Sequence, residues 1–227
     1  MKLKYFSVGE WALWLSSVGL ILCSFIAFEG GNIAALIASL IGVTALIFTA
    51  KGHPIGQVLM IAFCIMYGII SYFFAYYGEL ITYAGMSLPM AILSLISWLR
   101  HPAGENTREV AVNRISGKEH IFMWGIALPI TVSFYFILEA FNTKNLLPST
   151  ISVATSFLAV YLTFRRDPLY AVAYAANDII LIVLWSMAAA TEPRYLAMVI
   201  CFAAFLANDI YGFFNWHRMG KRQKHEK

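Results

Sequence analysis

Long apolar runs separated by short polar breaks make up most of this chain. Each run approaches the roughly 20 residues that an α-helix needs to cross the hydrocarbon core of a bilayer. The strands of a membrane barrel are about half that length and alternate apolar with polar residues, a pattern that these runs lack. The sequence therefore predicts an all-α integral membrane protein. Its eight predicted transmembrane helices cover residues 11–28, 33–50, 55–77, 81–99, 121–141, 149–164, 169–190 and 195–216.

The breaks between the runs carry residues that favour turns. They read Gly30-Gly31-Asn32, Lys51-Gly52-His53-Pro54, Arg166-Asp167-Pro168 and Thr191-Glu192-Pro193. One connection, from Arg100 to His120, is longer and polar. The first run, 11–28, is too long for the apolar part of a signal peptide, and no small-x-small cleavage site follows it. We interpret it as a retained span and expect a single transmembrane domain over residues 1–227.

Composition and charge agree with this interpretation. Apolar residues make up 60% of the chain and charged residues 12%, against roughly 45–50% and about 25% in soluble proteins. Of the 16 Lys and Arg residues, all but Lys144 and Arg194 lie in segments predicted to share one side of the membrane. Positively charged loops stay in the cytoplasm. We therefore expect both termini to be cytoplasmic.

The second half of the chain repeats features of the first. Residues 33–54 match residues 147–168 at an offset of 114, which pairs Thr49 with Thr163. The third span of each half ends alike, in Trp98-Leu99-Arg100 and in Trp216-His217-Arg218. We expect both tryptophans to anchor helix ends at the membrane surface.

An even number of spans separates equivalent positions, so the two copies point the same way across the membrane. The sequence therefore predicts a parallel repeat of three-helix bundles, at about 33–100 and 147–218, joined by a linking helix at about 121–141. Transporters with repeats of this kind bind their substrates between the halves, near the middle of the bilayer.

The chain lacks the motifs of common enzyme classes. It has no His-Glu-x-x-His, no Gly-x-Ser-x-Gly and no phosphate-binding loop. Cys23, Cys64 and Cys201 each lie inside an apolar run, where a packing role is expected rather than a disulfide or a metal site. We expect no enzymatic activity, cofactor, metal or nucleic-acid partner. A membrane transporter and a non-transporting scaffold or receptor remain as function classes.

Two Asn-Asp pairs lie deep in the last two spans, Asn177-Asp178 and Asn208-Asp209. At 1.5 Å per residue, both are roughly 12–14 Å from the cytoplasmic ends of their helices. Charged groups inside a span are costly and are candidates for function by default. Adjacent antiparallel helices could present both pairs to one cavity.

Helical spacing adds aromatic and amide side chains to these pairs. The candidate substrate-binding residues are Tyr170, Tyr174, Asn177, Asp178, Trp185, Asn208, Asp209, Tyr211 and Asn215. Such a set suits a planar heteroaromatic compound that carries hydroxyl groups. Gln57, near the cytoplasmic surface, is a candidate gate residue. The alternative is that these groups only hold helices together, as polar side chains often do in membranes.

Two stretches of the chain resemble the PnuC family of bacterial vitamin transporters. The first runs from Tyr77-Gly78-Glu79 through Met86-Ser87-Leu88-Pro89-Met90-Ala91 to Ser97-Trp98-Leu99-Arg100-His101-Pro102, and the second is Leu206-Ala207-Asn208-Asp209-Ile210-Tyr211-Gly212-Phe213-Phe214-Asn215-Trp216. The resemblance implies a SWEET-like arrangement of the two bundles in the bacterial inner membrane. It also implies uptake of nicotinamide riboside by facilitated diffusion.

The seventh-span signature of that family has Trp, Gln and Asn, where this chain has Tyr170, Tyr174 and Asn177. This departure leaves thiamine or riboflavin open as the vitamin. A proton-coupled carrier that uses Asp178 or Asp209 is a further alternative. The expected partners are a small-molecule vitamin and the lipid bilayer, and a homo-oligomer is compatible with the sequence.

Overall fold

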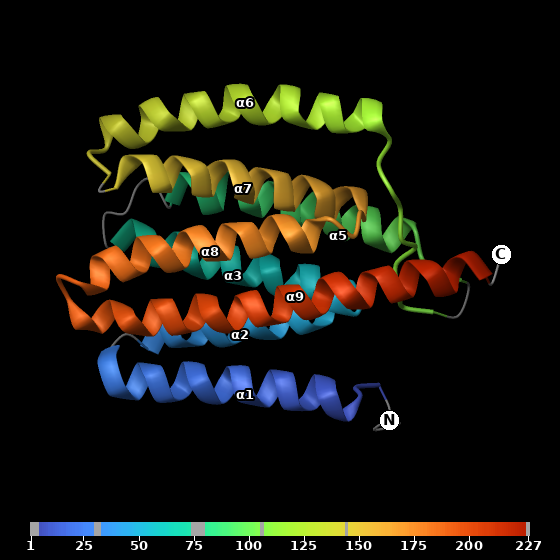
Figure 1. Ribbon diagram of the computed structural model, residues 1–227, viewed down its shortest axis with the longest axis horizontal. Helices are drawn as coiled ribbons and strands as arrows, with labels where there is room; N and C mark the ends of the chain where they lie inside the picture. Colours follow the sequence, from blue (N-terminus) through green and yellow to red (C-terminus); the bar gives the residue numbers. More distant parts are fainter. Residues whose placement is uncertain (1–4, 30–32, 74–79, 105–106, 144, 226–227) are drawn as a thin grey trace.

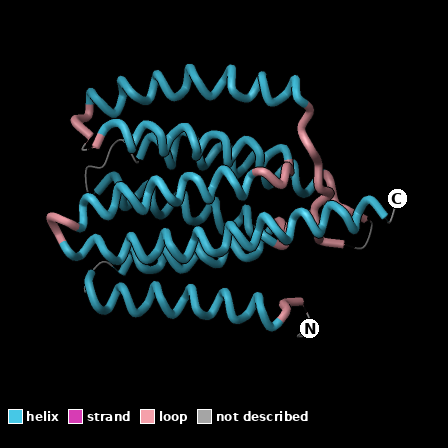
Figure 2. The backbone as a smooth tube through the Cα atoms, in the orientation of Figure 1, coloured by secondary structure: helices cyan, strands magenta, loops and turns pink. Residues whose placement is uncertain are grey.

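The computed structural model describes residues 5–29, 33–73, 80–104, 107–143 and 145–225. Eight of the helices in this part of the chain are long and apolar enough to cross a membrane (Figures 1 and 2), as the sequence predicts. The elements are α1 (Val8–Ser24) continued by the π-helix η1 (Phe25–Glu29), α2 (Ile33–Ala50), α3 (Ile55–Phe73), the π-helix η2 (Ile81–Ser87) continued by α5 (Leu88–Arg100), α6 (Gly117–Ala140), α7 (Leu146–Arg165), α8 (Tyr170–Ala189), the 3₁₀-helix η3 (Pro193–Tyr195) and α9 (Leu196–His225).

The helix bounds agree with the predicted spans to within about four residues, except at the last one. Helix α9 continues to His225, nine residues beyond the predicted end at 216. Its polar end is held by the long connection, because Gln223 Oε1 accepts a hydrogen bond from the Val112 amide at 2.8 Å and Arg222 pairs with Glu109. The predicted turn at 30–32 and the segment 74–79 lie outside the described residues.

Two groups of helices form the centre of the molecule. One contains α2, α3 and η2–α5, and the other contains α7, α8 and α9. They meet along two contacts, α2 with α9 and α5 with α7. Helices α1 and α6 lie at opposite edges, α1 against α2 and α9 and α6 against α7 (Figure 1). Both termini lie at the same end of the bundle.

Two tryptophans close the centre at the end that carries the termini. Trp98 Nε1 donates to the Thr163 carbonyl at 2.9 Å, and Trp216 Nε1 donates to the Thr49 carbonyl at 2.9 Å. Their rings are 5.4 Å apart, and both are fully buried. This corrects the expectation of an interfacial tryptophan belt, because each indole finds its acceptor on the opposite half of the molecule. If the two halves of the molecule are exchanged, the Trp98–Thr163 bond takes the place of the Trp216–Thr49 bond, and the reverse.

The outer helices are attached in the same reciprocal manner. Ser7 caps α1 and Ser116 caps α6, and each serine accepts a hydrogen bond from the amide of a Glu three residues later. Glu10 pairs with Lys51 at the end of α2, and Glu119 pairs with Arg165 at the end of α7. A capping residue and a carboxylate near a helix N-terminus both stabilise the first turn. Each glutamate therefore fixes the start of an outer helix and its position on the bundle.

Candidate functional site

A cavity of about 830 Å³ lies between the two halves of the molecule. It extends from the loops around 141–145 and 191–195 to a floor formed by Gln57, Ser94 and Thr163. The tryptophan pair lies directly beyond this floor. Thr163 lines the floor, and its carbonyl accepts the hydrogen bond from Trp98. The cavity thus reaches the end opposite the termini and is closed toward the termini. Its volume lies within the range of roughly 300–1,000 Å³ typical of small-molecule sites.

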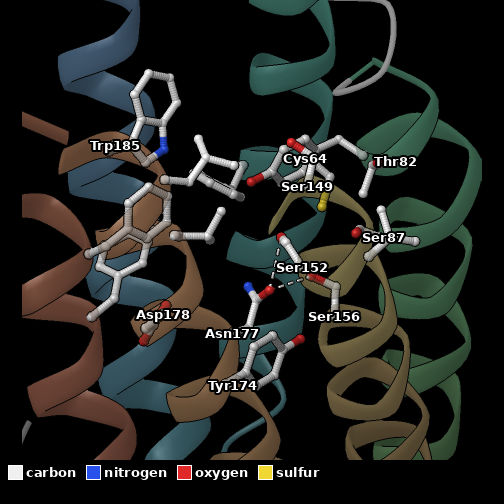
Figure 3. A pocket seen from close by; sticks show the side chains of 18 of the residues that line it. Cys64, Thr82, Ser87, Ser149, Ser152, Ser156, Tyr174, Asn177, Asp178 and Trp185 are labelled. Atoms are coloured by element: carbon white, nitrogen blue, oxygen red, sulfur yellow. Dashed lines mark hydrogen bonds between the residues drawn. The ribbon is translucent and has the colours of Figure 1, made fainter. Parts of the chain in front are cut away.

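Asn177 on α8 is held in one orientation by hydroxyl groups of α7. Its Oδ1 lies 3.1 Å from Ser152 Oγ, 2.9 Å from Thr155 Oγ1 and 3.1 Å from Ser156 Oγ. In the structure the amide oxygen therefore faces the hydroxyl groups of α7. The Nδ2 group has no partner among the described residues and points away from the serines (Figure 3). Asn177 therefore offers an oriented hydrogen-bond donor to a ligand.

Aromatic side chains flank this donor. Tyr174 precedes Asn177 by one turn of α8, and Trp185 lies two turns further along the same helix. Trp185 packs against Tyr195, with ring centroids 5.4 Å apart. Tyr83 of η2 faces them from the other half. Aromatic faces at the walls and amide or hydroxyl groups between them are suited to a flat ring that carries polar substituents.

The π-helix η2 brings a second polar wall to the cavity. Thr82, Tyr83 and Ser87 of this element line the cavity, with Thr82 and Ser87 on the side opposite Trp185 (Figure 3). A π-helix is wider than an α-helix and is frequent at functional sites. Pro89, in the first turn of α5, lacks the amide hydrogen that a regular helix would use at this point. The proline explains why the hydrogen-bonding pattern changes here.

Two acids complete the wall formed by α8 and α9. Asp178 and Asp209 both line the cavity and are almost fully buried. Their carboxyl groups are within hydrogen-bonding reach of each other. Among the described residues that line the cavity there is no Lys, Arg or His.

The structure separates the predicted site residues into two groups. On the cavity wall it places Gln57, Tyr174, Asn177, Asp178, Trp185 and Asp209. Four other predicted residues are not part of the cavity lining: Tyr170, Asn208, Tyr211 and Asn215. Each of these four has packing or hydrogen-bonding partners elsewhere in the described part of the chain.

The partners of these four residues explain their orientation. Asn208 Nδ2 donates to Ser17 Oγ of α1 at 3.0 Å, and Tyr211 Oη donates to Glu10 Oε1 at 2.6 Å. Asn215 Nδ2 donates to the Ala50 carbonyl of α2 at 2.8 Å. Tyr170 is fully buried against Trp216, with centroids 4.9 Å apart. These contacts join helices, as the alternative interpretation of the polar residues predicts.

The sequence analysis missed the hydroxyl stripe of α7 and the wall of η2. Ser149, Ser152 and Ser156 line the cavity at spacings of three and four residues, one face of a helix. That spacing was available in the sequence. Serine and threonine are weak signals in a span, however, because their hydroxyls can also bond to carbonyls of their own helix.

Comparison with known proteins identifies the family. The model of the nicotinamide mononucleotide transporter family matches residues 32–218, most of the chain. The chain belongs to this family. It is also 23% identical over 224 residues to the nicotinamide riboside transporter PnuC of Neisseria mucosa, covering 94% of this chain and 84% of that one.

A solved structure has the same fold. The crystal structure of the vitamin B3 transporter PnuC superposes with a TM-score of 0.81 at 20% identity, covering 96% of this chain and 94% of that one. The protein is therefore a multi-pass membrane protein of a transporter family, as its resemblance to PnuC proteins predicts, and not a member of an enzyme family.

Proposed function

We propose that this protein carries nicotinamide riboside, or a closely related vitamin, across the bacterial inner membrane by facilitated diffusion. The observation that carries the proposal is the cavity between the halves, in which an oriented Asn177 amide lies between the aromatic rings of Tyr174 and Trp185. The amide would bond a hydroxyl or carboxamide oxygen, and the rings would pack on the flat base. A scaffold without transport activity would have no need of such a space, so the cavity favours a carrier.

The charges of the cavity favour a riboside over a mononucleotide. A phosphate group needs basic side chains, backbone amides or a helix N-terminus to replace its hydration. The described lining has no Lys, Arg or His, and it contains the acids Asp178 and Asp209. A ligand with a phosphate would therefore meet repulsion, whereas a nucleoside would not.

Two alternatives to facilitated diffusion of nicotinamide riboside are a different vitamin and a proton-coupled mechanism. Thiamine and riboflavin are also flat heteroaromatic vitamins, and Tyr174 stands where the family signature has Gln. The aspartate pair could also couple transport to a proton gradient. Both alternatives use the same cavity, so the identity of the ligand and the effect of a gradient distinguish them.

We infer that the chain is a parallel repeat. The reciprocal Trp98–Thr163 and Trp216–Thr49 bonds support this inference, because an approximate twofold relation between the halves exchanges them. The Glu10–Lys51 and Glu119–Arg165 pairs extend the relation to α1 and α6. The repeating unit would then contain four helices, with α6 serving both as linking helix and as the counterpart of α1.

We expect both termini in the cytoplasm and the open end of the cavity outside the cell. A cysteine at Lys224, exposed near the end of α9, should resist an impermeant thiol reagent in intact cells. A cysteine at Arg194, exposed in the short helix η3 before α9, should react. The native residues Cys23, Cys64 and Cys201 are replaced by alanine in both variants. If the cysteine at 224 were labelled and the one at 194 protected, the protein would have the opposite orientation, with both termini outside the cell.

In liposomes, nicotinamide riboside should equilibrate across the membrane without any imposed gradient. Radiolabelled substrate inside should approach the outside concentration, and an imposed pH or sodium gradient should leave that endpoint unchanged. Protein-free liposomes are the control. Accumulation above the outside concentration would establish the coupled carrier instead, and uptake of thiamine or riboflavin in place of nicotinamide riboside would establish the other vitamin.

A further inference from the structure

The acids Asp178 and Asp209 form a pair at the centre of the protein without a basic partner. Asp178 on α8 is 4% exposed and Asp209 on α9 is 3% exposed, and their carboxyl groups are within hydrogen-bonding reach. No basic residue is found in the described lining of the cavity that they border. The third acid of the lining, Glu192, lies at the loop end and pairs with Arg194 at 2.6 Å.

The protein itself compensates such a pair poorly. Two adjacent carboxylates repel each other, and burial adds a cost for each charge, so a positively charged group beside them is favourable. One oxygen atom, Asp178 Oδ2, is buried, and no hydrogen-bond donor of the described residues reaches it. Buried polar atoms are nearly always paired, and an orphan at the wall of a cavity indicates a group supplied by a ligand.

In the described part of the chain, no positively charged side chain faces the pair. The titratable groups that interact with it are Tyr170 and Tyr174 on α8. Cys64 on α3 lines the same cavity. Helix α2 contains no titratable residue. The remaining candidates on packed helices are engaged elsewhere: Glu10 of α1 with Lys51, and Tyr161 and Arg165 of α7 with Glu119.

We propose that Asp178 and Asp209 form an anionic subsite that binds a positively charged ring and selects a cationic ligand over a neutral ligand of the same shape. This inference rests on the proposed function, since nicotinamide riboside carries its charge on the pyridinium ring. Tyr174 and Trp185 on the same wall add aromatic faces, which attract cations.

The test compares nicotinamide riboside with its dihydro form, which is neutral and nearly identical in shape. Isothermal titration of the purified protein should give an affinity for the cation roughly tenfold or more above that for the neutral compound. Asp178→Asn and Asp209→Asn should each weaken binding of the cation by roughly tenfold or more while changing that of the dihydro form about twofold at most.

The matched control is Glu139→Gln, an acid-to-amide change on an exposed face of α6 that does not line the cavity. It should leave both affinities unchanged. Thermal unfolding establishes that each variant is folded, and if a variant is not, the preference of the wild type for the charged compound decides. Equal affinity of the wild type for both compounds would overturn the subsite and leave the proposed function standing. Failure to bind either compound would overturn the proposed function itself.

Discussion

Replacing Asn177 by leucine should weaken the binding of nicotinamide riboside roughly tenfold to a hundredfold, which corresponds to about 1–3 kcal/mol. The amide nitrogen of Asn177 faces the cavity because its oxygen is held by hydroxyls of Ser152, Thr155 and Ser156. Leucine removes the donor and leaves those hydroxyls without their acceptor. A buried polar group of the ligand would then lose its partner. Isothermal titration or a ligand-induced thermal shift measures the loss.

The matched control is Asn208→Leu, the same substitution at a similar depth in the next helix. Asn208 bonds Ser17 of α1 and is not part of the cavity lining. Its affinity for the ligand should stay within about twofold of wild type. Its stability should change by about 0.6 kcal/mol, the average value of an interhelical hydrogen bond in a membrane. Equal losses of affinity in both variants would mean that the cavity described here is not the binding site.

The eight spans could be predicted from the sequence because lipid imposes a simple rule. A backbone inside the hydrocarbon layer must satisfy its own hydrogen bonds, so apolar length alone identifies a spanning helix. The start of α2 at Ile33 and its end at Ala50 agree with the predicted 33–50. Outside the bilayer, water can satisfy the backbone, so apolar length no longer predicts where a helix ends. The extra turns of α9 depend on contacts such as Gln223 with Val112, which join residues 111 positions apart.

The direction in which a polar residue faces could not be predicted in the same way. Asn208 and Asp209 are neighbours in α9, so their side chains point about 100° apart around the helix. Asp209 faces the cavity, whereas Asn208 faces α1. Tyr211 and Asn215 follow Asn208 at three and seven residues and share its face. The stripe was recognised from its spacing, but only the packing of α1 and α2 on α9 determines that it is turned away from the cavity.

Asn177 and Asp178 show that neighbours can also share a cavity. Both line it, because the cavity is wide and curves around α8 from the serines of α7 to Asp209 of α9. The distance of a residue from the membrane surface can be counted along the helix, so the sequence predicts how deep a site lies. The wall on which a residue lies depends on long-range packing, and the sequence of a single helix does not contain this information.

Replacing Gly56 by alanine should reduce stability by about 1–3 kcal/mol, the usual cost of overpacking. Gly56 is the second residue of α3, where this helix touches the end of α2. An added Cβ would lie 2.4 Å from Thr49 Oγ1 and 2.6 Å from the Thr49 backbone nitrogen. Backbone atoms cannot rotate out of the way, so α2 and α3 must separate. Thermal unfolding in detergent measures the loss as a lower melting temperature.

The same change should also affect the closed end of the cavity, because the carbonyl of Thr49 accepts the indole hydrogen of Trp216. Displacing Thr49 weakens one of the two bonds that join the halves there, and transport in liposomes should fall with stability. The matched control is Gly125→Ala in α6, where an added Cβ meets nothing within 4 Å. Alanine is the better helix former by up to about 1 kcal/mol, so this variant should be as stable as wild type or more so. A Gly56→Ala variant that melts with wild type would show that α2 and α3 do not approach as closely as described.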